Sequence, residues 1–226
     1  MKKMKKILAV ILSLAMVLGM SITSFAAGTA KTASITLKGA AGATVYSQQI
    51  VEADQKNDVT GWKFCTNDAA AAFATSFKTS MKSADDNAAI EELIKLGALE
   101  TVPNTKAAAG QINTGDTSTA IIATAYSTAL TAAADTIDLT KVNAATNISN
   151  DYVVTKTATA GLHLIKADKA GFTYNPMMAY VAFDKTKTDG TVLAATVQAK
   201  GADNQIKKAI DVKKDATDNV APDQNN

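Results

Sequence analysis

The chain has few of the residues that usually carry catalysis, metal binding or covalent cross-linking. Cys65 is the one cysteine in 226 residues, so an intrachain disulfide is excluded, and we expect this side chain to pack as a small apolar group. His163 is the one histidine, and it lies within a strand-like pattern. The sequence has no HExxH, CxxC, P-loop, dinucleotide-binding or GxSxG motif. We therefore expect a protein that is not an enzyme and that holds no metal or cofactor.

Arginine is absent from the sequence, which argues against nucleic-acid binding. Proteins that bind nucleic acids normally carry a basic patch with arginines that make bidentate contacts. The formal net charge is +2, but four of the 23 basic residues are lysines among the first six positions. Without those four, 19 basic residues stand against 21 acidic ones, which is a net charge of −2. We expect no nucleic-acid partner.

The first 26 residues have the pattern of an export signal. A lysine-rich start, MKKMKK, precedes an apolar run of 14 residues, ILAVILSLAMVLGM, and small residues follow at Ser24 and Ala26. The pattern predicts cleavage between Ala26 and Ala27. The apolar run is shorter than the roughly 20 residues of an untilted membrane span, so we expect membrane contact only during export. A secreted protein of the cell surface is predicted.

Strand-like alternation occurs in two parts of the remaining chain. Residues 32–39, TASITLKG, place Ile35 and Leu37 on one face, and residues 44–53, TVYSQQIVEA, are rich in β-branched and aromatic side chains. The GAAGA segment between them predicts a turn. Four more strand patterns follow residue 150, namely DYVVTK, GLHLIKA, MAYVAFD and TVLAATVQAK. Asp189 and Gly190 predict a hairpin turn between the last two patterns.

Three helices are predicted between these strand patterns. We expect Asp68 to cap a helix that carries Phe73 and Phe77 one turn apart, and Asn87 to cap a second helix that ends at Gly97. A third helix is predicted after Asp116, and its apolar face comprises Ile121, Ile122, Ala125, Tyr126, Ala129 and Leu130. Strands, then helices, then strands predict a mainly β or α+β domain, or a β-sandwich with a helical insertion.

Two lysines near the end of the chain have contrasting surroundings. In TVLAATVQAK, Lys200 falls on the solvent side, opposite an apolar face made of Leu193, Ala195, Val197 and Ala199. In residues 204–212, NQIKKAIDV, Lys208 is instead in phase with isoleucine and valine side chains. A lysine taken out of water has a lowered pKa and a nucleophilic amine. Such an amine can condense with an asparagine amide, assisted by a carboxyl group, to form an isopeptide bond that joins strands without cysteine.

With these features the chain resembles the isopeptide-forming fimbrial proteins of Gram-positive bacteria, which are the sortase-assembled backbone pilins and related wall-anchored proteins. The likeness extends from about Ala33 to Asp211, and it rests on ASITLKGAAGATVYSQQIVEA, GLHLIKADKAGFTYNPMMAYVAF and VQAKGADNQIKK. It implies a structural pilus or adhesin subunit whose N-terminal domain is an Ig-like β-sandwich with about three inserted short helices. Other pilin subunits would be its partners, and host proteins or glycans its ligands.

The same resemblance implies roles for the lysines. Lys200 occupies the place where backbone pilins carry the lysine that sortase joins to the next subunit. Those pilins have Tyr-Pro-Lys-Asn there, whereas residues 198–201 of this chain read Gln-Ala-Lys-Gly. Lys208, or Lys207 if the register differs by one residue, corresponds to the lysine that forms the isopeptide bond of the following domain. The asparagine partner of that bond would lie beyond residue 226.

The expected organisation is a signal peptide over residues 1–26 and a pilin-like domain over residues 27–201. The first strand of a following domain is expected over residues 202–215, and a disordered polar tail over residues 216–226. The sequence contains no Leu-Pro-x-Thr-Gly sorting motif. The apolar surroundings of Lys208 favour a chain that is a fragment of a longer protein.

Two other functions remain open on the sequence. A secreted carbohydrate- or protein-binding module would place an exposed aromatic cluster near Trp62, Tyr46 or Tyr174. A secreted hydrolase would need a concave pocket with two carboxylates, or His163 hydrogen-bonded to a serine or an aspartate. The exposure of Trp62 therefore distinguishes the first alternative from a packed core.

Overall fold

The computed structural model describes residues 31–111 and 117–203, which form a β-rich fold of the α+β type. Ala26, Ala27, Asp116, Lys207 and Lys208 lie outside the described residues. The elements are β1 (Ala33–Lys38), β2 (Thr44–Ala53), β3 (Trp62–Phe64), α2 (Asp68–Met81), α3 (Asp86–Leu96), α4 (Thr119–Asp135), β4 (Ala145–Thr146), β5 (Asp151–Ala158), β6 (Gly161–Asp168), β7 (Phe172–Tyr174), β8 (Met177–Val181), β9 (Ala195–Gln198) and β10 (Gly201–Asp203).

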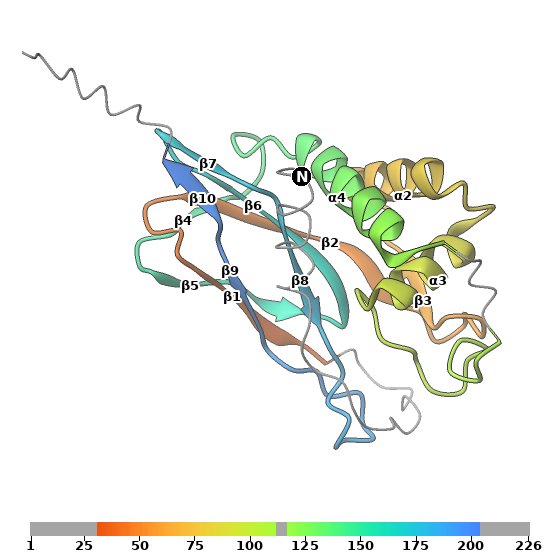
Figure 1. The fold of residues 1–226 in the computed structure, drawn as a ribbon. Coiled ribbons are helices and arrows are strands. Elements are labelled where there is room, and N and C mark those ends of the chain that lie inside the picture. Colours follow the sequence, from red (N-terminus) through yellow and green to blue (C-terminus); the bar gives the residue numbers. More distant parts are fainter. Residues whose placement is uncertain (1–30, 112–116, 204–226) are drawn as a thin grey trace, which may run out of the picture.

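The strands of the described chain form two larger sheets and a small strand pair (Figure 1). One sheet has the order β5–β1–β9, in which β1 runs antiparallel to β5 and parallel to β9. The other has the order β3–β2–β6–β8, with β4 also paired to β2, and its pairings are antiparallel. β10 pairs antiparallel with β7. The two strands predicted near the start of the chain are confirmed as β1 and β2.

β6 lies in the interior of its sheet and is buried on both faces over most of its length. Lys166 of β6 marks the helical side, because its Nζ donates to the carbonyls of Ala134 at 2.8 Å and Ile137 at 2.6 Å, at the C-terminal end of α4. A cation at this end complements the helix dipole and satisfies carbonyls that the helix leaves unpaired. The run of five buried residues at the start of β6 thus reflects cover on both sides.

The first predicted helix exists as α2, but its N-cap is Asn67 rather than Asp68. The Asn67 side chain accepts the Ala70 N–H at 3.0 Å, and Asp68 is the first helical residue. Asn67 also donates from Nδ2 to the carbonyl of Gln49 in β2, at 2.8 Å. Both residue types are good caps, so the tertiary contact with β2 decides between them.

The second predicted helix begins earlier than expected, because its N-cap is Asp85 and not Asn87. The Asp85 side chain accepts the Ala88 N–H at 2.9 Å. The predicted end at Gly97 is confirmed, with φ +80° at the C-cap. A left-handed cap of this kind favours glycine.

The predicted apolar faces of α2 and α4 meet in the core, with one exception. Phe73 and Phe77 are fully buried and stack with ring centroids 5.8 Å apart, and the Tyr126 ring meets Phe73 edge-on at 5.6 Å. Ile121, which we expected on the buried face of α4, is 55% exposed. It lies on the solvent face of α4, in phase with the exposed Thr124 and Thr128, whereas Ile122 in the same turn is fully buried.

The predicted hairpin at Gly190 is correct for the turn and wrong for the strands. Gly190 has φ +75°, and Phe183 pairs with Val192 across the turn. Beyond that bridge β8 pairs with β6, whereas β9 crosses to the other sheet and pairs with β1. Leu193, expected on the apolar face, is 41% exposed because it lies at this crossing, before β9 begins.

Candidate functional site

Lys200 lies between two hydrogen-bonded strand pairs. β9 ends beside Lys38 of β1, and the next residue, Ala199, donates its N–H to the Lys38 carbonyl at 2.8 Å. Lys200 is exposed, and its own carbonyl accepts the Asn175 N–H at 3.3 Å. β10 then begins at Gly201. The backbone on both sides of Lys200 is therefore fixed, and the lysine is presented from strands rather than from a long loop.

The strand pair after Lys200 packs closely. Gly201 lies opposite Tyr174, and a Cβ at position 201 would come within 2.7 Å of the tyrosine ring. Tyr174 stacks on Phe172 with centroids 6.2 Å apart, and the Lys169 Nζ lies 4.6 Å from the Phe172 centroid. Sequence reasoning placed Lys200 on the solvent side but missed this contact. The glycine that follows Lys200 was the available signal, because glycine permits a close approach.

The structure does not describe the other predicted site residues, so their positions relative to Lys200 are not defined. Lys207 and Lys208, and the cleavage residues Ala26 and Ala27, lie outside the described chain. Their roles stay predictions. Lys200 is thus the predicted linkage residue that has a described environment.

Trp62 belongs to the core rather than to an exposed aromatic cluster. It is fully buried, and its Nε1–H donates to the Glu100 carbonyl at 2.8 Å. The rings of Tyr180 and Phe183 pack against it, with centroids 6.3 and 5.8 Å away. A ligand cannot stack on a ring that is enclosed in this way, so Trp62 does not provide a sugar-binding platform.

His163 is buried within the sheet and is hydrogen-bonded to the backbone. It is 4% exposed, within β6, and its Nε2 lies 2.8 Å from the Thr159 carbonyl. Because a carbonyl only accepts, Nε2 must carry the proton and donate. Burial lowers the pKa of the ring, since the imidazolium would lose its hydration, and the Thr159 bond opposes that shift. This bond to the backbone differs from the contact with serine or aspartate that the hydrolase hypothesis required.

We expect the buried His163 to make stability depend on pH below about 6.5, its ordinary pKa. The folded pKa is depressed, so the unfolded chain takes up the proton first. The free energy of unfolding therefore keeps its full value above about pH 6.5. Below that pH it falls by up to ~1.4 kcal/mol per pH unit, until the pKa of His163 in the folded state is reached. Asp138, Asp184 and Asp189 have lowered pKa values, so their contribution is lost only below the ordinary value of 3.8.

Urea unfolding between about pH 4.5 and 6.5 checks this expectation, because histidine titrates there ahead of most carboxylates. His163→Gln removes the titration and keeps an N–H donor for the Thr159 carbonyl. Burial also raises the pKa of Glu92, but that dependence is common to both proteins, so the wild type should lose more unfolding free energy than the variant as the pH falls through this range. Equal slopes in the two proteins would contradict the assignment.

Cys65 is half-buried beside the core, as expected of a small apolar group. Burial raises the pKa of its thiol to about 12, and the Glu52 carboxylate adds to the rise. Because the thiolate is the nucleophile, a thiol with this pKa is unreactive at neutral pH.

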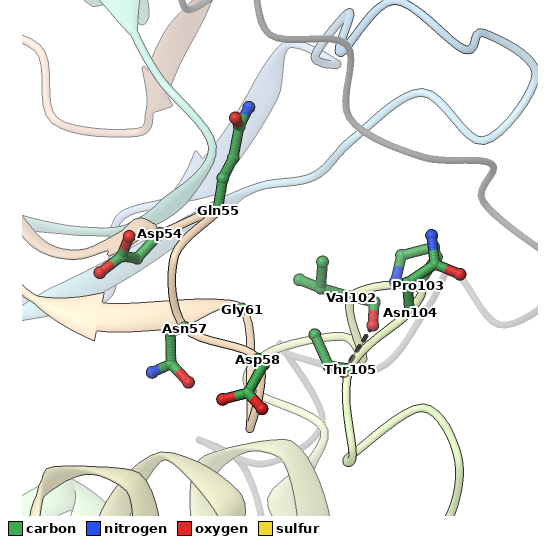
Figure 2. A pocket seen from close by; sticks show the side chains of 9 residues that line it. All are labelled: Asp54, Gln55, Asn57, Asp58, Gly61, Val102, Pro103, Asn104 and Thr105. Atoms are coloured by element: carbon green, nitrogen blue, oxygen red, sulfur yellow. Dashed lines mark hydrogen bonds between the residues drawn. The ribbon is translucent and has the colours of Figure 1, made fainter.

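A pocket of about 260 Å³ lies between the loop of residues 54–61 and the loop of residues 102–105 (Figure 2). Its carboxylates are Asp54 and Asp58, so it has the pair of acids that the hydrolase hypothesis required. Asp58 lies 3.3 Å from the Lys106 Nζ, and Asp54 lies 4.0 Å from the Lys63 Nζ. Lys63 lies closer to Glu52, at 3.4 Å, so three carboxylates share two lysines, and the hydrolase alternative stays a prediction.

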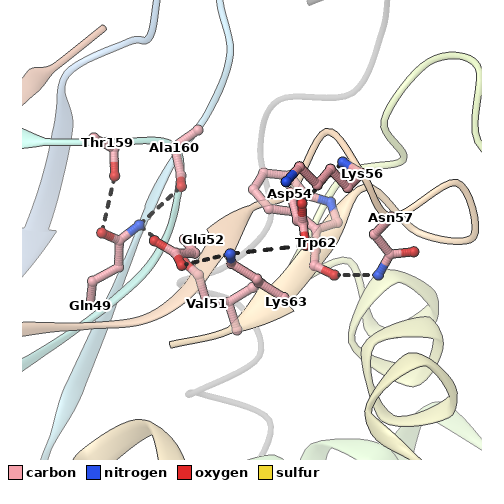
Figure 3. A network of polar contacts seen from close by, with 10 residues as sticks. All are labelled: Gln49, Val51, Glu52, Asp54, Lys56, Asn57, Trp62, Lys63, Thr159 and Ala160. Atoms are coloured by element: carbon pink, nitrogen blue, oxygen red, sulfur yellow. Dashed lines mark hydrogen bonds and ion pairs between the residues drawn. The ribbon is translucent and has the colours of Figure 1, made fainter. Parts of the chain in front are cut away.

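A polar network fixes the irregularity in β2 (Figure 3). The Gln49 Nε2 donates to the carbonyls of Ala160 at 3.1 Å and Val51 at 3.3 Å, and its Oε1 accepts from the Thr159 hydroxyl at 3.0 Å. The register between β2 and β6 shifts between Gln49 and Val51. These bonds satisfy the backbone where the regular ladder is interrupted, so the network stabilises the fold.

Neither a membrane span nor a metal cluster is found in residues 31–111 and 117–203. No helix there is long and apolar enough to cross a membrane, and no group of three or more His, Cys, Asp or Glu side chains is placed to hold a metal ion. Comparisons of the chain with protein-family models, with curated proteins and with solved structures gave no match.

Proposed function

We propose that the chain is a non-enzymatic structural subunit, or the N-terminal domain, of a secreted fimbrial or adhesin protein on the surface of a Gram-positive bacterium. The position of Lys200 carries the proposal: it is an exposed lysine whose backbone is held by the β1–β9 and β7–β10 pairs. A linkage lysine needs both features. Its amine must reach the active site of another protein, and its backbone must then hold the attached neighbour.

The proposed linkage is a transpeptidation by a sortase. The enzyme holds the threonine carbonyl of a partner's Leu-Pro-x-Thr-Gly signal as a thioester on its own cysteine. The neutral Lys200 amine attacks this carbonyl, the C–N bond forms and the C–S bond breaks. The thiolate leaves with the electron pair, and the proton of the amine passes to a base of the sortase. The product joins the Lys200 Nζ to the threonine of the partner by an isopeptide bond.

The finer architecture belongs to the same proposal. The two larger sheets would be the layers of an Ig-like β-sandwich over residues 27–201, with α2, α3 and α4 as its inserted helices. Burial of β6 on both faces supports this layering. Residues 202–215 would begin a following domain, in which Lys208 or Lys207 forms an internal isopeptide bond, and residues 216–226 would be a tail.

Peptide transfer to Lys200 tests the proposed function. The chain is incubated with a pilin-polymerising sortase and a peptide that carries Leu-Pro-x-Thr-Gly, and mass spectrometry locates the attached peptide. We expect modification of Lys200 in the wild type and its loss in Lys200→Arg, because arginine keeps the charge but stays protonated. Lys187→Arg is the matched control, since Lys187 is also exposed, on the turn between β8 and β9. Undiminished transfer to Lys200→Arg, or equal labelling of Lys187, contradicts the proposal.

A further inference from the structure

Residues 195–203, the last that the structure describes, pair with strands from two other parts of the fold. β9 pairs in parallel with β1 from Ile35 opposite Ala195 to Lys38 opposite Gln198. The Ala199 N–H and the Gln198 side-chain amide both donate to the Lys38 carbonyl, at 2.8 and 3.3 Å. β10 then continues along β7. The run from residue 195 to residue 203 is therefore bonded along its length to two other strands.

The parallel direction of β1 and β9 places the two ends of the described chain at opposite ends of this sheet (Figure 1). Lys31, just before β1, lies 3.4 Å from Asp189, in the turn that precedes β9. Lys200 lies beyond the other end, next to the β7–β10 pair. A pull on the start of β1 and on Lys200 in opposite directions thus acts along both strands.

Such a pull loads the hydrogen bonds between β1 and β9 together. In a parallel pair the bonds are evenly spaced along the strands, so sliding one strand past the other must strain them all at once. A pull on the ends of β1 and β9 that lie side by side would instead open the bonds one after another. Forced unfolding is governed by the unfolding barrier, which is higher when several bonds must break in the same step.

The apolar face of the pair adds to this resistance. Ile35 and Leu37 are fully buried, and Ala195 is 9% exposed. Sliding β9 by one residue would turn its side chains to the opposite face and bring the polar Thr196 towards the core. The register is therefore fixed by packing as well as by hydrogen bonds.

We propose that the β1–β9 pair is a mechanical clamp that resists tension applied along the strands between the start of β1 and Lys200. The proposal goes beyond the proposed function and does not depend on it, because the clamp is loaded only when the start of β1 is held as well. The clamp itself is a property of the described fold, and it is measurable without a sortase.

Single-molecule force spectroscopy on the full chain tests the clamp by changing only the direction of pulling. Cys65→Ser removes the native thiol in every protein. Thr32→Cys with Lys200→Cys places handles at opposite ends of the β1–β9 pair, and Ala41→Cys with Lys200→Cys places them at the same end. All three handle positions are exposed. Urea unfolding of the two proteins serves as the control for equal thermodynamic stability.

We expect the rupture force to be severalfold higher for the 32/200 handles than for the 41/200 handles at the same loading rate. Equal forces, or a higher force for the 41/200 handles, overturn the clamp. The outcome is independent of peptide transfer. If the rupture force for the 32/200 handles is no higher than that for the 41/200 handles while peptide transfer to Lys200 is normal, the clamp alone is rejected. If the 32/200 rupture force is severalfold higher but no peptide is transferred, the proposed function alone is rejected.

Discussion

Replacing Gly161 by alanine is expected to cost about 3–5 kcal/mol of the free energy of unfolding, as the sum of backbone strain and steric overlap. Gly161 opens β6 with φ +133°, a conformation that residues with a side chain rarely adopt. An added Cβ would lie 1.9 Å from the carbonyl oxygen of Val51. That atom belongs to the backbone of β2, so it cannot move aside as a flexible side chain would.

Gly110→Ala is the matched control for this substitution. Gly110 also has a positive φ, +71°, but nothing lies within 4 Å of the position that its Cβ would take. It should therefore show only the strain of a left-handed backbone, about 1–2 kcal/mol. Urea unfolding followed by the fluorescence of Trp62, the one tryptophan in the chain, measures both variants. Equal losses would show that the contact between β6 and β2 is not as close as described.

Replacing Trp62 by alanine is expected to destabilise the fold by a similar amount, about 3–5 kcal/mol. The substitution removes a fully buried ring that packs against Tyr180 and Phe183, and it leaves the Glu100 carbonyl without its donor. Trp62→Phe retains much of the packing and loses the hydrogen bond, so its cost should be smaller, about 1–3 kcal/mol. Circular dichroism in urea is the suitable measurement, because both variants lack the fluorophore.

The Trp62 variants also separate a core residue from a binding residue. If the ring were an exposed platform, Trp62→Ala would change stability by less than about 0.5 kcal/mol, as surface substitutions usually do. An unfolding free energy that close to the wild-type value would contradict the buried position of Trp62. It would also support a sugar-binding role for Trp62. The half-buried, stacked pair of Phe172 and Tyr174 keeps the wider binding-module alternative a prediction.

Local patterns were sufficient to predict the three described helices and the strands β1, β2, β5, β6, β8 and β9, but they missed the short strands β3, β4, β7 and β10. Alternation in residues 32–39 predicted β1, because Ile35 and Leu37 face the core and the polar residues between them do not. The spacing of Phe73 and Phe77 predicted the buried face of α2. The helix starts were misplaced by one or two residues, since neighbouring Asn and Asp side chains are all competent caps and contacts with other elements select among them.

The pairing of strands could not be predicted from local patterns. The turn at Gly190 suggested that β8 and β9 are partners. The two arms of the turn form one bridge, between Phe183 and Val192, and β9 then pairs with β1, which is far away in the sequence. The close approach of Gly161 to Val51 depends on the same kind of long-range pairing. A sequence of strand patterns specifies which faces are apolar, but many strand orders can bury those faces.

The exposure of Lys200 was predictable from the sequence, but the contacts that hold its backbone were not, because they come from distant segments. Alternation in TVLAATVQAK placed Lys200 on the solvent side, and the lysine is exposed. What fixes its backbone comes from distant segments: the Asn175 N–H bonds to its carbonyl, and Tyr174 packs over Gly201. Side-chain alternation predicts which residues are exposed, but it does not predict which segments will pair with the strand.

The central claim is that Lys200 is the point at which this protein is covalently joined to its neighbour. Mass spectrometry of protease-digested envelope material, from cells that make the protein, tests it most directly. The account predicts a branched peptide in which the Lys200 Nζ carries an amide bond to the threonine carboxyl of another chain. Envelope material in which Lys200 is unmodified, or in which the branch is at a different lysine, would contradict the claim.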